Sequence, residues 1–228
     1  MFYKRILIFF LLFVTRQALF AQDVNPYGLK IINSPEAYRK GIAVDSNSRL
    51  VEINKYIRDI KLDIRYATAN NFAGQAVYSE ARAFARLPVV LALNAVQNEL
   101  RQKGLGLKIY DAYRPYSVTV KFFDIASDKN FVASPKTGSR HNRGCAIDLT
   151  LIRLRTGKEL RMPTAYDSFA PEASPNFNDL PRRVLANRKL LIDAMEKHGF
   201  KVLHNEWWHF DFHTWKEFDL MDIPFNKL

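Results

Sequence analysis

The sequence predicts an α+β fold: one domain, residues 22–228, with a largely antiparallel central sheet flanked by helices, after an N-terminal signal peptide. The chain has 228 residues, of which 48% are hydrophobic and 25% charged, as in ordinary globular proteins. Strand-like segments occur in pairs, separated by segments of helical periodicity, which is typical of this class. No internal repeat or low-complexity linker indicates a further domain.

Residues 1–21 have the features of a secretory signal peptide. Residues 1–5 are basic, residues 6–14 are nine consecutive apolar residues, and residues 18–21 provide a cleavage end before Gln22. Because a membrane-spanning helix needs ~20 apolar residues, this run is too short to span. We therefore expect an exported protein, periplasmic or secreted, without stable membrane insertion after cleavage. An uncleaved N-terminal anchor is the alternative.

The net charge of the chain limits the classes of partner that we expect. The net charge of +11 falls to about +8 when the three cations of residues 1–21 are removed, and a basic exported protein suits an anionic envelope surface. No basic run is interleaved with aromatic residues, so we expect no nucleic-acid partner.

Cys145 is the only cysteine and lies in an apolar run, which favours a buried inert thiol. No pattern indicates an oligomeric state.

The first half of the domain contains three strand-like segments and one clear helix. Residues 50–53 and 60–66 alternate apolar and polar side chains, and the second segment especially predicts a half-buried strand. Residues 67–78 are rich in Ala, Asn and Gly and predict a loop. Residues 107–113 predict the next strand. Residues 88–104 predict a helix opened by proline and ended by glycine, with an apolar face formed by Val89, Val90, Leu93, Val96 and Leu100.

The second half begins with a helix over residues 115–126. Residues 145–154 then predict a strand, a turn follows at Thr156 and Gly157, and residues 158–162 predict a hairpin partner. Residues 164–178 are rich in Pro, Ser and Asn, and a loop of this length predicts a functional segment over the site.

The C-terminal part contains one more helix and the last two strands. Asp179 is expected to cap a helix that Pro181 opens and Gly199 ends. Residues 200–203 and 208–212 predict the final strands.

His141 and Asp148 form the first polar motif. Gly144 between them lets the backbone bend closely around a site. Asp148 stands in an otherwise apolar strand, where a buried carboxylate needs a partner. That partner could be a metal ion or a neighbouring arginine such as Arg140 or Arg143, and composition alone leaves these alternatives even.

Glu206 and His209 form the second polar motif. The two motifs together supply two imidazoles, one carboxylate that can bind a metal and one that can stay free. A catalytic zinc site needs that inventory: three protein ligands, an open position and a base. Because side chains alternate along a strand, positions three apart point to opposite faces. Both residues can face one site only if Glu206 precedes the strand or a bulge changes the register.

Arg114 forms a third polar position. It precedes Pro115, which favours extended backbone, so it is expected at a strand end just before a helix. A guanidinium there could bind a carboxylate or stabilise a developing oxyanion. Pairing with Asp111 or another surface acid is the structural alternative.

These segments together resemble the zinc D-alanyl-D-alanine dipeptidases, the family that includes the vancomycin-resistance dipeptidase. The S-x-H-x-x-G-x-A-x-D pattern occupies residues 139–148, the E-x-W-H pattern residues 206–209 and the Y-R-P segment residues 113–115. Residues 63–72 also look like the family's N-terminal segment. The resemblance covers roughly residues 50–215, most of the domain.

The resemblance implies a zinc-dependent hydrolase that splits D-alanyl-D-alanine, a reaction linked to cell-wall peptidoglycan. It implies one Zn²⁺ per chain, bound by His141, Asp148 and His209, with Glu206 as general base. The best-known members act in the cytoplasm, so the expected export of this chain is a departure from the family.

The resemblance also implies how the substrate is held. Arg114 would aid the transition state, and Ser139 and Asp167 would bind the charged ends of the dipeptide. A dipeptidase must reject longer chains, so we expect a small closed pocket with walls from residues 70–78 and 165–178.

Two alternatives to a dipeptidase remain open. One is a D,D-carboxypeptidase that trims peptidoglycan stem peptides. The other is a non-catalytic zinc or peptidoglycan-binding module, which would have no need of the spare carboxylate of Glu206 beside the metal.

Overall fold

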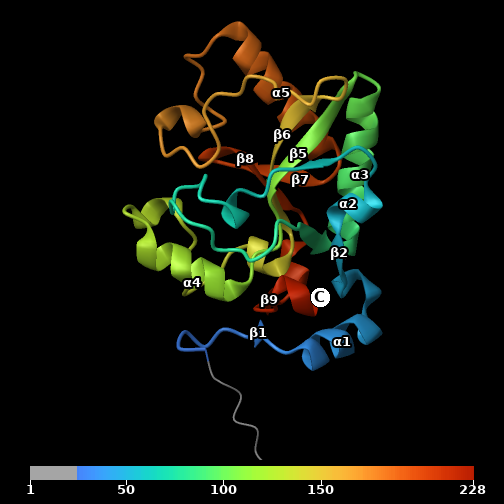
Figure 1. Ribbon diagram of the computed structural model, residues 1–228, viewed down its shortest axis with the longest axis vertical. Coiled ribbons are helices and arrows are strands. Elements are labelled where there is room, and N and C mark those ends of the chain that lie inside the picture. Colours follow the sequence, from blue (N-terminus) through green and yellow to red (C-terminus); the bar gives the residue numbers. More distant parts are fainter. Residues whose placement is uncertain (1–24) are drawn as a thin grey trace, which may run out of the picture.

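The computed structural model describes residues 25–228 (Figure 1), so the expected signal peptide, residues 1–21, lies outside the described residues. The helices of this part are α1 (Pro35–Val44), α2 (Ile53–Tyr56), α3 (Leu87–Arg101), α4 (Tyr116–Ile125) and α5 (Arg182–Lys197). The strands are β1 (Ile31–Ile32), β2 (Leu50–Glu52), β3 (Lys61–Leu62), β4 (Phe84–Arg86), β5 (Leu105–Asp111), β6 (Ala146–Arg153), β7 (Phe200–Leu203), β8 (Glu206–Phe212) and β9 (Leu220–Met221). Within residues 25–228, no helix has the length and apolar character needed to cross a membrane.

The central sheet has five strands in the order β3-β5-β6-β8-β7. The pairs β5–β6, β6–β8 and β8–β7 are antiparallel, and β3 lies parallel to β5. Two smaller sheets pair β2 with β4 and β1 with β9. The predicted α+β class with a largely antiparallel central sheet is confirmed.

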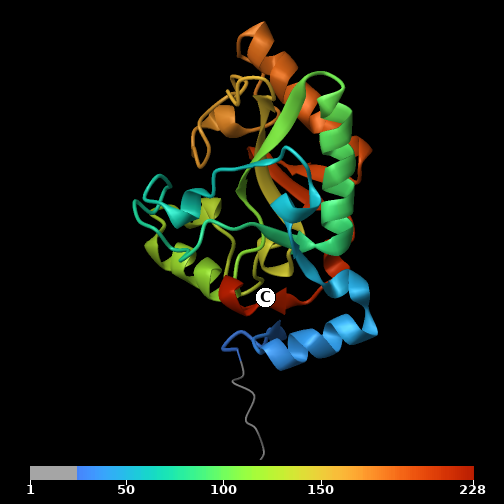
Figure 2. The same ribbon diagram turned by 45° about the vertical axis from the view of Figure 1, so that its right-hand side comes forward.

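Helices lie on both sides of this sheet. α3 and α5 contact each other and the central strands. α4 lies across the sheet from α3 in both views (Figures 1 and 2), and α1 lies with β1 and β9 at the end of the molecule remote from α5. The helix predicted over residues 88–104 is α3, and its five predicted apolar positions are fully buried.

Strand β6 separates the apolar core from the polar site. Ile147, Leu149 and Leu151 are fully buried on one face, as alternation along a strand requires. Asp148 and Thr150 are buried on the other face. The polar face of β6 therefore carries the first predicted carboxylate into the interior.

The strand predicted over residues 60–66 is wrong in its extent. β3 covers Lys61–Leu62, and a 3₁₀ turn over Arg65–Ala67 follows. The turn buries the ring of Tyr66 against Phe72 and Phe122, and burial of an aromatic ring outweighs the weak preference of one residue for extended backbone.

Two smaller predictions need correction. Residues 158–162 do pair with β6, through an isolated antiparallel bridge between Glu159 and Ile152, but they form no regular strand; Pro163, which has no N–H to donate, follows directly. Asp179 does not cap α5, because the N-cap position is Pro181 and no side chain makes the capping hydrogen bond.

Candidate active site

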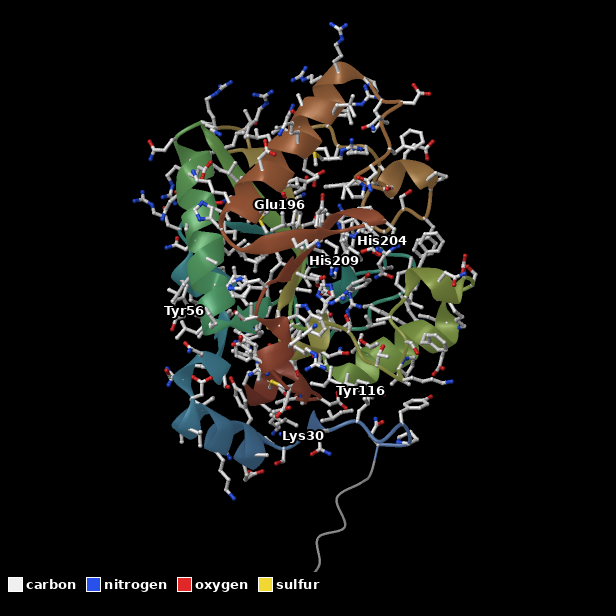
Figure 3. The ribbon with its side chains drawn as sticks, turned by 180° about the vertical axis from the view of Figure 1, so that it is seen from behind. Lys30, Tyr56, Tyr116, Glu196, His204 and His209 are labelled. Carbon is white, nitrogen blue, oxygen red and sulfur yellow. The ribbon has the colours of Figure 1, made fainter. Side chains whose placement is uncertain are left out.

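His141, Asp148 and His209 come together in the interior. His209 Nδ1 lies 3.1 Å from His141 Nε2 and 3.0 Å from Asp148 Oδ1, and His141 Nε2 lies 3.3 Å from Asp148 Oδ1. All three side chains are buried, and Asp148 on β6 stands directly opposite His209 on β8. In Figure 3, His209 lies near the centre of the molecule, remote from Lys30 at one end.

Gly144 lets the His141 turn lead straight into β6. The 3₁₀ turn His141–Arg143 ends at this glycine, whose φ of +70° is a conformation that other residues rarely adopt. A Cβ at position 144 would also lie 2.5 Å from Cδ2 of the buried Leu50 side chain, which would have to move to accommodate a larger residue. Both constraints favour a glycine between His141 and Asp148.

Hydrogen bonds outside the cluster fix both imidazoles. His141 Nδ1 donates to the carbonyl of Ala112 at 2.7 Å, which directs Nε2 toward the cluster. His209 Nε2 lies 3.0 Å from Asp211 Oδ1, which directs Nδ1 inward. Asp211 was not among the predicted site residues, although its position two residues after His209 on one strand puts it on the same face.

The charges of the cluster fit a divalent cation. Burial alone would raise the pKa of Asp148, but the two imidazoles hold it well below its usual range. Burial lowers the pKa of His209, but hydrogen bonds to Asp148 and Asp211 outweigh it and raise that pKa to about 10. Two nitrogens and one carboxylate oxygen that converge in this way are ligands typical of a catalytic metal site, and a cation would replace the shared proton.

Glu206 stands beside the cluster. Its Oε2 lies 3.8 Å from His209 Nδ1, and its side chain is 19% exposed. Val202 of β7 pairs with Phe210 of β8, but the next residue of β7, Leu203, pairs with Glu206, four positions from Phe210. The pairing of the two strands is therefore irregular between Glu206 and Phe210. This is the change of register that Glu206 and His209 need to face one site. Burial raises the pKa of Glu206, and His209 opposes that effect.

Arg114 is buried and lines the same cavity. Its Nε and Nη2 donate to Asp111 Oδ2 at 3.0 and 2.7 Å, so the pairing considered as an alternative does occur, but inside the protein. Burial lowers the pKa of Arg114, and the charge of Asp111 more than offsets this. The guanidinium also lies over the ring of Phe122 at 4.8 Å. Asp111 thus holds the charged group in a fixed orientation at the cavity wall.

Ser139 and Asp167 line the cavity as well. Ser139 Oγ accepts from the backbone N–H of His141 at 3.2 Å. Asp167 has a φ of +61°, and its Oδ1 accepts from the hydroxyl of Tyr66 at 2.9 Å. Its Oδ2 is buried and has no hydrogen-bond partner among the described residues. Burial and the charge of Asp148 raise the pKa of Asp167 to about 7.

The cavity has a volume of about 370 Å³, and aromatic side chains form part of its wall. Phe72 from the loop over residues 67–78 and Phe169 from the loop over residues 164–178 contribute, as expected for those segments. Trp208 and Trp215 complete the wall, and neither was predicted to bind a ligand. Charged and polar side chains, among them the histidine–aspartate cluster and Glu206, line much of the rest of the cavity.

A metal-dependent peptidase is the class of protein that this donor set and fold define. The family model described as D-ala-D-ala dipeptidase matches residues 46–219, and the chain belongs to that family. The D-alanyl-D-alanine dipeptidase of Escherichia coli K12 is 31% identical over 183 residues, which cover 80% of this chain and 94% of the relative. The enzymes of the same name from Enterococcus faecalis V583 and Streptomyces coelicolor are 30% and 29% identical over 69% of this chain and 88% of each relative. The resemblance noted in the sequence is confirmed.

Proposed function

We propose that this protein hydrolyses D-alanyl-D-alanine to free D-alanine with zinc as its metal, as part of peptidoglycan metabolism. The observation that carries the proposal is a free carboxylate, Glu206, beside three converging ligand side chains in a small cavity. The names of the relatives support the choice of substrate.

His141, Asp148 and His209 would hold the cation. When bound, zinc polarises a carbonyl group and lowers the pKa of water toward ~7. The softness and number of these ligands, two imidazoles and one carboxylate, favour zinc over magnesium or calcium.

Glu206 moves the proton. Its raised pKa brings it nearer to neutral pH, where a carboxylate can accept a proton from the attacking water and return it to the leaving amine. Its partly exposed side chain leaves it free to reach both groups.

The remaining polar groups would hold the dipeptide. Arg114, fixed by Asp111, would stabilise the negative charge that develops on the carbonyl oxygen. The unpaired Oδ2 of Asp167 offers an acceptor for the substrate's ammonium group, and Ser139 offers a hydroxyl for its carboxylate.

A comparison of two substrates tests the proposal. Activity on free D-alanyl-D-alanine with none on a pentapeptide ending in D-alanyl-D-alanine supports a dipeptidase. The opposite result would make the protein a D,D-carboxypeptidase, and zinc binding without hydrolysis of either would make it a binding module.

Replacement of the free carboxylate tests the mechanism. We expect Glu206→Gln to lower kcat by ~10²–10⁴, because it removes the proton acceptor, and to leave the zinc content unchanged. Glu196→Gln, on the exposed surface of α5 (Figure 3), is the control and should keep full activity. Unchanged turnover in Glu206→Gln would remove Glu206 from the mechanism.

We also propose that the protein is exported. The basic start, apolar run and cleavage end of residues 1–21 support this. N-terminal sequencing of the protein recovered from the periplasm or medium tests it, and an intact Met1 on cytoplasmic protein would contradict it.

A further inference from the structure

Tyr166 lies behind the metal ligands, in the loop between β6 and α5. Its ring is buried and stacks on Tyr110 with centroids 4.6 Å apart, and it meets Trp208 edge to face at 5.6 Å. Aromatic neighbours on several sides leave the ring little freedom, so the position of its hydroxyl is fixed by packing.

The hydroxyl of Tyr166 donates to Asp148 Oδ2 at 2.9 Å. The other oxygen of the same carboxylate, Oδ1, is the one close to His141 Nε2 and His209 Nδ1. The two oxygens of Asp148 therefore have different roles: one faces the cluster, and the other faces a hydrogen-bond donor.

We infer that Tyr166 is a positioning residue that makes Asp148 a one-oxygen ligand of the metal. A carboxylate that is free to turn can bind a cation through both oxygens. The hydrogen bond from Tyr166 engages Oδ2 and so leaves Oδ1 alone to bind. The inference rests on the proposed metal site.

This arrangement keeps a coordination position open for chemistry. A catalytic site has three protein ligands and one position for water or substrate, and a second oxygen from Asp148 would compete for that position. Loss of the hydroxyl would also leave Oδ2 buried without a donor, which favours its rotation toward the cation.

The backbone next to Tyr166 supports a positioning role. Asp167 has a φ of +61°, so two consecutive side chains both point inward, one toward Asp148 and the other into the cavity. Asp167 is anchored separately by the hydroxyl of Tyr66. Removal of the Tyr166 hydroxyl should therefore affect the metal more than substrate binding.

The test compares Tyr166→Phe with Tyr110→Phe. Tyr110 belongs to the same ring stack, and its hydroxyl donates to Glu159 at 2.7 Å, outside the cluster, so its loss is a matched control. The Zn²⁺ dissociation constant is measured by competition with a chromophoric chelator. We expect Tyr166→Phe to bind Zn²⁺ ~10–100-fold more weakly, because its Asp148 carboxylate is no longer held in place before the metal binds. Tyr110→Phe should bind Zn²⁺ as the wild type does.

Three further measurements separate a positioning role from general damage to the fold. Thermal unfolding of the metal-free proteins should show that both variants are still cooperatively folded at the temperature of the zinc titration, because each loses one hydroxyl and keeps its ring in the stack. At saturating zinc, Tyr166→Phe should show a lower kcat with an unchanged KM. The visible bands of the Co²⁺-substituted variant should weaken, as they do when the coordination number rises.

Equal zinc affinity in Tyr166→Phe and the wild type would overturn the inference, as would the same loss in Tyr110→Phe. If the proposed function is wrong, the wild-type protein can bind zinc and still hydrolyse no dipeptide. The zinc affinities of the wild type and Tyr166→Phe can then still be compared, so this outcome is distinct from failure of the inference.

Discussion

Two buried arginines in this protein find hydrogen-bond acceptors for their charged groups in different ways. Arg114, 8% exposed, is paired with the carboxylate of Asp111 and faces the cavity. Arg86, 1% exposed, makes no ion pair with any described residue. Its Nε donates to the carbonyl of Arg143 at 2.7 Å, and the guanidinium also donates to the carbonyls of Ser48 and Asp219.

The difference separates a charged group held at the cavity wall from one that links segments of the fold. An ion pair with one carboxylate orients Arg114 and leaves its charge beside the cavity. Carbonyl acceptors on three segments instead make Arg86 a link between the turn before β2, the His141 turn and the residue before β9. Its backbone N–H also donates to the carbonyl of Gly144. Burial without a carboxylate lowers the pKa of Arg86, whereas Asp111 raises that of Arg114.

Among the arginine substitutions, Arg114→Lys should have the largest effect on turnover. Lysine keeps the charge opposite Asp111 but loses the planar group that can bind two oxygens. We expect kcat to fall by ~10²–10³, the loss typical of one oxyanion donor. The measurement is steady-state hydrolysis of D-alanyl-D-alanine with zinc content checked. An unchanged kcat would make Arg114 a structural residue like Arg86.

Arg86→Met should act on stability instead of turnover. It leaves buried carbonyls without donors, and each such group costs about 1–3 kcal/mol, so we expect a loss of about 3 kcal/mol or more. Urea unfolding measures it, with Arg39→Met on the exposed face of α1 as the control. If the folded variant loses turnover while its stability is unchanged, the separation of the two arginines is wrong.

A third arginine, Arg82, extends the comparison to the surface. It donates from Nε and Nη2 to both oxygens of Glu52, at 3.0 and 2.9 Å. Its hydrogen bonds lower the pKa of Glu52 from 4.5 to about 2, with Lys55 also contributing. Because the pair is partly solvated, we expect it to contribute about 1 kcal/mol.

The pH dependence of that contribution gives the smallest effect. The pKa of Glu52 is lower in the folded protein, so its contribution is complete above about 4.5 and is lost as the pH falls toward about 2. The stability difference between wild type and Glu52→Gln should therefore shrink over that range in urea unfolding. A constant difference would show that the ion pair does not contribute.

The sequence best predicted those features that depend on residues close together in the chain. Each polar motif lies within a short segment, and the unusual setting of Asp148 in an apolar strand pointed to a partner. The bulge condition on Glu206 and His209 followed from alternation along a strand, and the register of β8 meets it. The helices α3, α4 and α5 followed from periodicity and proline positions.

What escaped prediction depends on distant residues. Arg86 bonds to segments near positions 48, 143 and 219, and no local pattern indicates such a contact. β1 pairs with β9, about 190 positions away, and is two residues long. α1 also escaped, although Ser34 caps it and Pro35 opens it. Tyr166, next to Asp167, was not predicted as a site residue. The direction in which a loop side chain points depends on the tertiary fold and is not indicated by the local sequence.

The tryptophans give the protein an optical reporter of its own site. All three of them lie at or next to the cavity: Trp208 and Trp215 in its wall, and Trp207 buried beside Trp208 with ring centroids 5.4 Å apart. Intrinsic fluorescence therefore arises almost wholly from this neighbourhood. Ligand or metal titrations can be followed by tryptophan emission alone, without a label that would disturb so small a cavity.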